Sequence, residues 1–244
     1  MLRLLDLTLP SPAENLALDE ALLLALNDQA ARGPDAPPPV ETLRFWESPV
    51  RFVVLGVSGR LREEVDLEAC ARAGVPILRR ASGGGTVVQG PGCLNFALVL
   101  SLEARPELRD VTRSYARILG GLRDALGLEG AEPDGTSDLA FGGRKISGNS
   151  QKRTRHAILH HGTLLHGFDV VCLEELLREP AKQPAYRAGR PHAEFVRNAP
   201  LSASEIRSRL TAAWSAAPPS AFQVPDLGPL IAEKYGNREW LERF

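Results

Sequence analysis

The chain has 244 residues, a net charge of -1, 43% hydrophobic residues and 24% charged residues. These values are ordinary for a soluble globular protein that is long enough to bury a sizeable core. The near-zero charge excludes a global field that would recruit nucleic acid or an anionic membrane. No apolar run approaches the roughly 20 residues of a membrane span.

The three cysteines, Cys70, Cys93 and Cys172, are an odd number without CxxC spacing. This pattern argues against a disulfide framework and a zinc knuckle, and it is typical of a reducing compartment. The N-terminus also lacks an apolar segment followed by a small-residue cleavage site. We therefore expect a cytoplasmic protein, and no composition shift divides residues 1–244 into more than a single domain.

The first predicted helix spans 11–33. Ser11 and Glu14 have the spacing of a capping box, and Pro12 suits the first helical position. A proline-rich loop over 34–40 follows. The residues expected on the buried face of the helix are Leu18, Leu22, Ala25 and Leu26.

Short apolar runs then predict several strands and one short helix before residue 102. Their apolar content indicates a sheet that is covered on at least one face. The helix is expected over 65–74. The strands are expected over 42–47, 51–57, 75–80, 85–89 and 94–101.

The second half of the chain contains the clearest helix, over 108–127. Residues 138–147 predict a hairpin, because Gly142 and Gly143 supply the positive φ angles of a two-residue turn. Interleaved helices and strand pairs predict an α+β fold with a mixed, mostly antiparallel sheet. A further strand is expected within 156–170, and helices within 173–179 and 202–214. The buried stripe expected on the 108–127 helix is Val111, Tyr115, Ile118, Leu119, Leu122 and Leu126.

The stretch RRASGGGTVVQG, at 79–90, places two arginines and a serine ahead of three glycines. It is neither a P-loop nor a dinucleotide fingerprint, because the lysine, the spacing and the following helix are missing. Bare glycine backbone accepts a close anion. Because side chains alternate along a strand, only one of the arginines can face such a ligand, and Arg80 shares parity with Ser82. A solvated β-turn is the alternative.

Two further stretches carry candidate site residues. Lys145 follows the glycine turn of the hairpin, where an ammonium group can reach a phosphate or carboxylate, or extend into water. His160 and His161 point to opposite faces of a strand, so they cannot chelate one metal together. One is expected in the core and the other beside a pocket, or both serve structure alone.

These stretches, in this order, resemble the lipoate–protein ligase and lipoyltransferase family. The matching segments are RRASGGGTVVQGPGCLNF, DLAFGGRKISGNSQ and HHGTLL, with ENLALDEALL, RFWESPVRFVVLGVSG and EKYGNREWLERF extending the likeness over nearly the whole chain. The resemblance implies a biotin/lipoate-ligase-like catalytic domain, in which sheets enclose a cleft and helices lie outside.

The family's site residues carry over by position. Lys145 would be the catalytic residue, in contact with both the nucleotide phosphate and the acyl carbonyl, and Asp138 would be a site for Mg²⁺. The nucleotide-binding residues would be Arg80, Ser82, Gly83, Gly84, Gly85, Thr86, Val87, Val88 and Lys145. The lipoate-binding residues would be Lys145, Ser147, Gly148, His161 and Gly162.

The resemblance implies that ATP and Mg²⁺ convert lipoate to lipoyl-AMP, and that the lipoyl group passes to a lysine of an acceptor. The acceptor would be an apo lipoyl domain or a glycine-cleavage H-type protein, and the enzyme a monomer. The alternatives are an octanoyl or lipoyl transferase that uses acyl carrier protein or preformed acyl-AMP, and a non-catalytic acyl-nucleotide-binding module. Biotin ligation is a lesser alternative.

Two departures from the family pattern bear on these alternatives. The chain ends at Phe244 without a C-terminal accessory domain, so a separate accessory polypeptide is a possible partner. Related octanoyltransferases use a cysteine nucleophile. One branch places it before the hairpin lysine, where EPDGTSDLAF contains none. Cys93 and Cys172 are the remaining candidates, each with a structural role as the alternative.

The proline-rich stretch 180–198 is locally basic. We expect it to close over bound acyl-adenylate, to contact an acidic lipoyl domain or acyl carrier protein, or to form a solvated surface loop. Its residues of interest are Lys182, Arg187, Arg190, His192 and Arg197.

Overall fold

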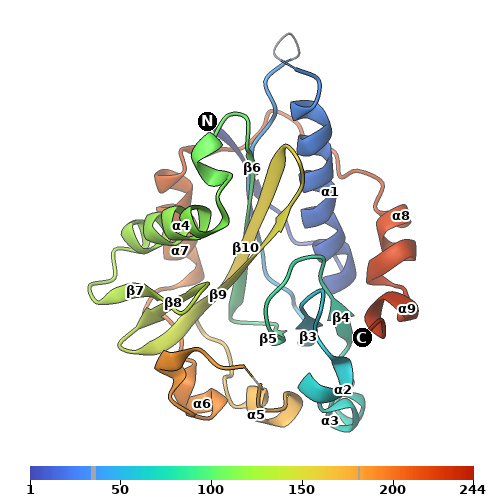
Figure 1. The fold of residues 1–244 in the computed structure, drawn as a ribbon, viewed down its shortest axis with the longest axis vertical. Coiled ribbons are helices and arrows are strands. Elements are labelled where there is room, and N and C mark those ends of the chain that lie inside the picture. Colours follow the sequence, from blue (N-terminus) through green and yellow to red (C-terminus); the bar gives the residue numbers. More distant parts are fainter. Residues whose placement is uncertain (34–36, 181) are drawn as a thin grey trace.

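A computed structural model describes residues 1–33, 37–180 and 182–244, and two sheets form its framework (Figure 1). The predicted mixed, mostly antiparallel α+β fold is confirmed. The eight-stranded sheet runs in the order β11 (Ala216–Ala217), β1 (Leu2–Asp6), β2 (Thr42–Trp46), β6 (Cys93–Ser101), β10 (Ala157–Leu165), β9 (Arg144–Arg153), β8 (Asp138–Phe141), β7 (Ala131–Asp134). The three-stranded sheet runs in the order β4 (Ile77–Arg79), β3 (Phe52–Leu55), β5 (Val87–Gln89).

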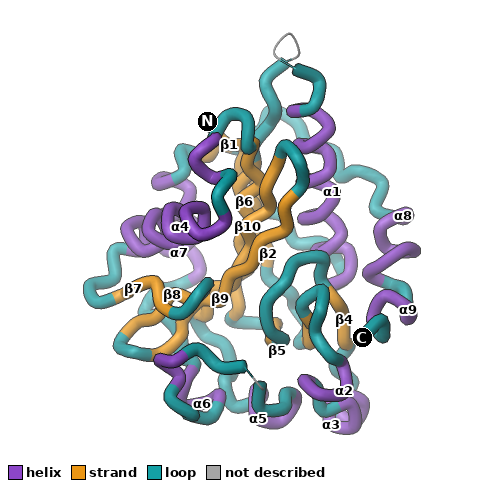
Figure 2. The backbone as a smooth tube through the Cα atoms, in the orientation of Figure 1, coloured by secondary structure: helices purple, strands orange, loops and turns teal. Residues whose placement is uncertain are grey.

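Helices cover the large sheet on both faces, and Figure 2 shows the strands as a band between them. One face packs against α4 (Val111–Leu126) and α7 (Ala203–Ala213), and the other against α1 (Pro12–Ala30). The remaining helical segments are α2 (Leu61–Glu64), α3 (Leu67–Arg72), η1 (Pro106–Leu108), α5 (Cys172–Leu176), η2 (Ala185–Arg187), α6 (His192–Phe195), α8 (Gly228–Leu230), η3 (Ile231–Tyr235) and α9 (Arg238–Leu241).

Strand β6 shows how the sequence builds this layering. All nine of its residues are buried, and all but Asn95 and Ser101 are apolar, as expected for a strand covered on both faces. Because side chains alternate, Phe96 and Leu98 belong to the core beneath α4 and α7, whereas Ala97 and Val99 belong to the core beneath α1.

Helix α1 begins with the predicted capping box. The Ser11 side chain accepts from the Glu14 backbone N–H, and the Glu14 carboxylate accepts from Ser11 N at 2.8 Å. Ala25 is exposed, so its predicted burial is wrong; Leu23 is buried instead, one turn after Asp19. The helix thereby turns a face that carries both leucines and polar residues toward the sheet.

The other element predictions hold with one further correction. Gly142 and Gly143 have φ angles of 59° and 68°, as the two-residue turn requires. Val111 is 52% exposed, because it is the first residue of α4 and lies beyond the sheet. Residues 37–40 form no helix or strand, and the rest of the predicted loop, 34–36, lies outside the described residues.

The C-terminal segment packs back onto β4 through Arg79. The Arg79 guanidinium is 1% exposed and donates to Leu241 O at 2.6 Å and to Gly59 O at 2.7 Å. In return, Trp240 Nε1 donates to Arg79 O at 3.0 Å. Only one of the two adjacent arginines is thus available to a cleft, as the strand alternation predicted. Within the described residues, no helix has the length and apolarity needed to cross a bilayer.

We predict that Arg79→Met lowers the free energy of unfolding by about 2–4 kcal/mol, because several buried carbonyls lose a charged donor. Urea denaturation measures this change. The matched control is Arg72→Met, whose side chain is 72% exposed beside Glu68 and whose loss is expected within about 0.5 kcal/mol. Equal losses for both variants would contradict the structural role given to Arg79.

Candidate active site

A cavity of about 500 Å³ opens where β5, β9 and β10 meet the segment from α5 to α6. Its wall includes parts of all three stretches singled out in the sequence: the glycine turn, the lysine hairpin and the His-Gly strand. Arg80 and Lys145 therefore border the same space, although 65 positions separate them. From the predicted set, the lining includes Arg80, Gly84, Gly85, Thr86, Val87, Val88, Asp138, Lys145, Ser147, Gly148, His161 and Gly162.

Arg80 supports the glycine turn from inside. It is 8% exposed, and its guanidinium donates to the carbonyl of Gly83, to Gly85 O at 3.0 Å and to Ser82 Oγ at 3.1 Å. Burial lowers the pKa of Arg80 to about 10, which still leaves the group protonated at neutral pH. The guanidinium of Arg80 therefore stabilises the turn and also contributes positive potential to the cavity that it borders.

The backbone of this turn offers donors to the cavity. Among the described residues, the N–H groups of Gly83, Gly84, Gly85 and Thr86 donate to no protein acceptor, while the carbonyls of Gly83 and Gly85 face Arg80. A run of unpaired N–H groups around a turn is an anion-binding arrangement. Gly84 and Gly85 are exposed, as a solvated turn requires, but Arg79 and Arg80 are 1% and 8% exposed, so the solvated arginines of that interpretation are wrong.

Gly56 is a site residue that sequence reasoning missed. A Cβ at Gly56 would lie 2.0 Å from Gly84 O, so only glycine lets β3 and the turn approach this closely. Gly84 itself has a φ of 85°, and a Cβ there would lie 2.9 Å from the Arg80 guanidinium. An isolated glycine at the end of a strand was the available signal.

Lys145 reaches the cavity by crossing Gly148. A Cβ at Gly148 would lie 2.8 Å from Lys145 Nζ. The ammonium pairs with Asp138 Oδ1 at 2.7 Å, and Tyr186 donates its hydroxyl proton to the other oxygen, Oδ2, at 2.8 Å. Burial, followed by the Asp138 charge, raises the pKa of Tyr186, so the phenol remains a donor. Lys145 is thus held by a carboxylate that an incoming anion must replace.

The cavity does not fit a resident Mg²⁺. Both Asp138 oxygens have partners, as do those of Glu64, which accepts from Thr86 Oγ1 at 2.6 Å and from Arg60 N at 2.7 Å. Asp19 accepts from Arg44 and Trp46. Within the described lining, no carboxylate oxygen is left for a metal, so the metal assignment to Asp138 stays a prediction without support from this arrangement.

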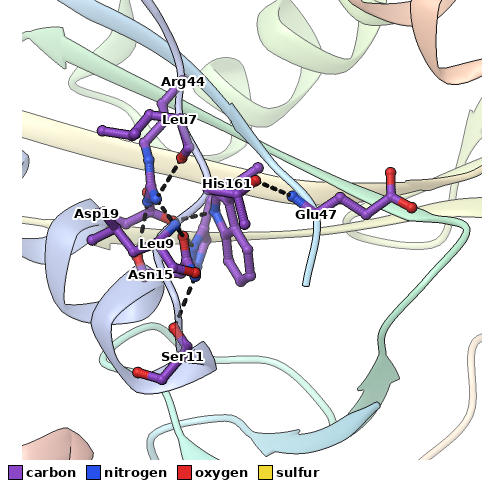
Figure 3. A network of polar contacts seen from close by, with 10 residues as sticks. Leu7, Leu9, Ser11, Asn15, Asp19, Arg44, Glu47 and His161 are labelled. Atoms are coloured by element: carbon purple, nitrogen blue, oxygen red, sulfur yellow. Dashed lines mark hydrogen bonds and ion pairs between the residues drawn. The ribbon is translucent and has the colours of Figure 1, made fainter. Parts of the chain in front are cut away.

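A buried polar network lies behind His161 (Figure 3). Asp19 and Arg44 form an ion pair of 2.5 Å, and Trp46 Nε1 donates to the second Asp19 oxygen at 3.2 Å. Burial alone would raise the pKa of Asp19, but the Arg44 charge and His161 lower it. His161 lies 4.0 Å from Asp19 and shares a 2.5 Å hydrogen bond with Ser82. The network thus joins α1 to the glycine turn.

The two adjacent histidines face opposite sides of the sheet, as predicted. His160 lies in the α4 core, 5.6 Å from the Tyr115 ring centroid, and is hydrogen-bonded to Gln151 at 3.0 Å. Burial and the neighbouring His161 lower the pKa of His160 to about 3. His160 is therefore neutral and belongs to the core, whereas His161 borders the cavity.

We predict that His160 makes the protein acid-sensitive. The pKa of His160 in the folded protein lies below the unfolded value of about 6.5. The stability that the neutral ring contributes is therefore complete above pH 6.5 and is lost as pH falls, by about 1.4 kcal/mol per pH unit. Urea denaturation between pH 7 and 4 measures the slope. His160→Gln should flatten it by that amount, and an unchanged slope would contradict the neutral core histidine.

In the basic stretch 180–198, the described residues 182–198 do not form a solvated loop. Arg187 is 3% exposed and bonds to Glu179 at 2.8 Å, Arg190 donates to Gly143 O at 2.9 Å, and Arg197 lies 4.9 Å from the Phe141 ring centroid. Arg197 N also donates to Lys145 O at 2.9 Å. Three of the five basic residues thus fasten the segment beside Lys145, where it forms one wall of the cavity.

No cysteine borders the cavity. Cys70, Cys93 and Cys172, all in the described part of the chain, are buried. Burial raises the pKa of Cys93 to about 12 and that of Cys172 to about 11. A thiol that stays protonated and buried is a poor nucleophile, so the structure favours the structural role for each.

Comparison with known proteins shows the family of this chain. Residues 11–200 match the lipoyl protein ligase A/B catalytic domain family. Octanoyltransferase LipM of Carboxydothermus hydrogenoformans is 32% identical over 96% of both chains. LipM of Symbiobacterium thermophilum is 30% identical over 98% of this chain and 97% of its own.

Two solved structures with the same fold are lipoate-protein ligases by name. A lipoate-protein ligase A bound with ATP superimposes with a TM-score of 0.82 at 26% identity, over 99% of this chain and 98% of that chain. A bipartite lipoate protein ligase of Thermoplasma acidophilum gives 0.78 at 26% identity, over 99% and 96%. This chain belongs to the lipoyl protein ligase A/B catalytic domain family, as its motifs indicated. It is an enzyme of the lipoate–protein ligase or related lipoyl/octanoyl transferase class.

We predict that Gly56→Ala costs about 1–3 kcal/mol of stability, because the new methyl group overlaps the Gly84 carbonyl. Gly120→Ala, in α4, is the control: a Cβ there meets nothing within 4 Å and should add about 0.5–1 kcal/mol. Thermal or urea unfolding should show a loss of stability for Gly56→Ala and a gain for Gly120→Ala. A neutral Gly56→Ala would contradict the close approach of β3 to the turn.

Proposed function

We propose that this enzyme transfers a lipoyl or octanoyl group to a lysine of an acceptor protein through an acyl-adenylate. The observation that carries the proposal is the run of unpaired N–H groups at 84–86, which lines one cavity with Lys145. An ATP-bound relative and a Thermoplasma acidophilum relative with bound lipoic acid, 25% identical with a TM-score of 0.81, support it. ATP, lipoate and Mg²⁺ as cosubstrates are part of this proposal.

Formation of an acyl-adenylate brings two anions together. A carboxylate oxygen of the acid attacks the α-phosphorus of ATP, and the bond to pyrophosphate breaks. The N–H groups of 84–86 would bind the phosphoryl oxygens, and Lys145 would leave Asp138 to neutralise the charge between carboxylate and phosphate. Donors fixed before the reaction stabilise such a transition state without reorganisation.

Transfer uses the same groups. The acceptor amine attacks the acyl carbonyl, an amide bond forms, and the bond between carbonyl carbon and AMP oxygen breaks. Lys145 would stabilise the oxyanion that develops on the carbonyl. Asp138 and Tyr186 hold the ammonium in place before and after this exchange.

The apolar part of the cavity suits the acyl chain. Leu16, Trp46 and Phe96 line it, next to His161 and Gly162. Each buried methylene contributes about 0.8 kcal/mol. Such an apolar pocket selects acyl chains by length, but it discriminates weakly between lipoyl and octanoyl groups of similar length.

Octanoyl transfer from an already activated donor is the second candidate. The two LipM relatives favour it, since both are octanoyltransferases by name and match nearly the whole chain. Because no thiol borders the cavity, the acceptor amine would then attack the donor directly, without a cysteine thioester. The 180–198 wall would lie beside the incoming donor or acceptor.

The proposed partner is an apo lipoyl domain or an H-type acceptor protein. A bipartite ligase with its E2 lipoyl domain among the structural relatives supports this proposal and that of a separate accessory polypeptide. Cytoplasmic localisation and a monomeric state stay predictions.

The expected result is lipoyl-AMP formation when the protein meets lipoate, labelled ATP and Mg²⁺ without acceptor. Lys145→Ala should lower the rate by a factor of about 10²–10³, because one preorganised cation is removed. Lys152→Ala, on the same strand, is the matched control and should retain the rate. Thin-layer separation of the labelled products measures the adenylate.

The alternative has its own readout. Absence of lipoyl-AMP, together with octanoyl transfer from an octanoyl carrier protein to a lipoyl domain, would replace the adenylate mechanism by direct transfer. Loss of that transfer in Cys93→Ala or Cys172→Ala, with folding retained, would contradict the structural role of the cysteines.

A further inference from the structure

Three potential metal-binding side chains converge on the cavity wall formed by 172–195. Glu174 comes from α5, Glu179 from the segment after it, and His192 is the first residue of α6. One ligand atom from each lies within 4.8 Å of the other two. His192 also borders the cavity, so this cluster sits at its rim.

His192 is the unusual member of the cluster. It is 8% exposed, and its Nδ1 has no hydrogen-bond partner within the described part of the chain. Glu179 Oε1, at 3.4 Å, lies beyond the usual hydrogen-bond range. A buried polar atom without a partner points to a missing ligand.

One of the three donor separations equals that of a tetrahedral transition-metal site, and the other two are at most 4.8 Å. Ligand bonds of about 2.0–2.1 Å separate two donors by about 3.3–3.4 Å, the separation of His192 Nδ1 and Glu179 Oε1. Glu179 Oε2 accepts from Arg187 at 2.8 Å, and Glu174 Oε1 accepts from Ala193 N at 2.8 Å. Such outer contacts orient carboxylates toward a metal.

Charge also favours a cation here. Two carboxylates lie beside the imidazole, and the Arg187 guanidinium, which pairs with Glu179 at 2.8 Å, offsets one of their charges. The nearby Lys145 ammonium is itself paired with Asp138. An imidazole with two carboxylates is a donor set that suits Zn²⁺ and its neighbours more than Mg²⁺ or Ca²⁺, which prefer oxygen alone.

We propose that Glu174, Glu179 and His192 form a binding site for a zinc-class divalent cation at the rim of the cavity. The cation would tie α5 to α6. Val196, directly after α6, forms a parallel bridge with Lys145, so the cation would fix the wall beside the lysine. This site does not depend on the acyl chemistry proposed above.

Cobalt titration of the untagged full-length protein tests the site. After removal of metals by a chelator, Co²⁺ should bind with one equivalent and give the visible absorption of a tetrahedral site, and Zn²⁺ should displace it. His192→Ala and Glu179→Gln should each weaken binding at least tenfold. Circular dichroism and urea unfolding show that the variants are folded.

His156→Ala is the matched control, because His156 also pairs with a glutamate, Glu103, at 2.9 Å, but outside this cluster. Its cobalt affinity should equal that of the wild type. Three results would overturn the proposal: no binding at millimolar Co²⁺, equal affinity in folded His192→Ala, or the intense near-ultraviolet band of a cobalt–thiolate bond. Acyl transfer is not part of this readout, so its failure and that of the proposed function remain distinguishable.

Discussion

The binding of Arg80 to the carbonyls of its own glycine turn is the interaction on which the site depends. Because the guanidinium takes the carbonyls of Gly83 and Gly85, the N–H groups of the same backbone remain for a ligand. A buried cation therefore acts twice, as a brace and as a source of positive potential close to the anion. Gly56 makes this possible by leaving room for the turn.

The sheet brings the parts of the site together. Strand β10 pairs with β6 on one side and β9 on the other, so His161 lies opposite Ala97 and Ser150. Ser150 Oγ in turn donates to Gly83 O at 2.8 Å, which links the large sheet to the turn. The register of three strands, more than any single contact, sets the distance between anion donors and lysine.

The relatives and the cavity bear on different parts of the chemistry. The LipM relatives are octanoyltransferases by name, whereas the cavity holds the groups on which the proposed acyl-adenylate route depends. A thioester route needs an accessible thiolate, and burial keeps each cysteine here protonated and away from the cavity. A phosphate route needs cations and N–H donors, which Lys145, Arg80 and the turn supply. Lys145 pairs with Asp138, whose second oxygen accepts a hydrogen bond from the Tyr186 hydroxyl.

The sequence by itself determined most element positions and the site motifs, because caps, glycine turns and apolar periodicity act locally. The Ser11 capping box, the Gly142 turn and the opposite faces of His160 and His161 needed no tertiary information. Only the tertiary structure decided that Arg79 binds the C-terminal segment, that Ala25 and Val111 are exposed, and that Tyr186 reaches Asp138. These outcomes depend on which surfaces meet across distant positions, and local patterns contain no information about that pairing.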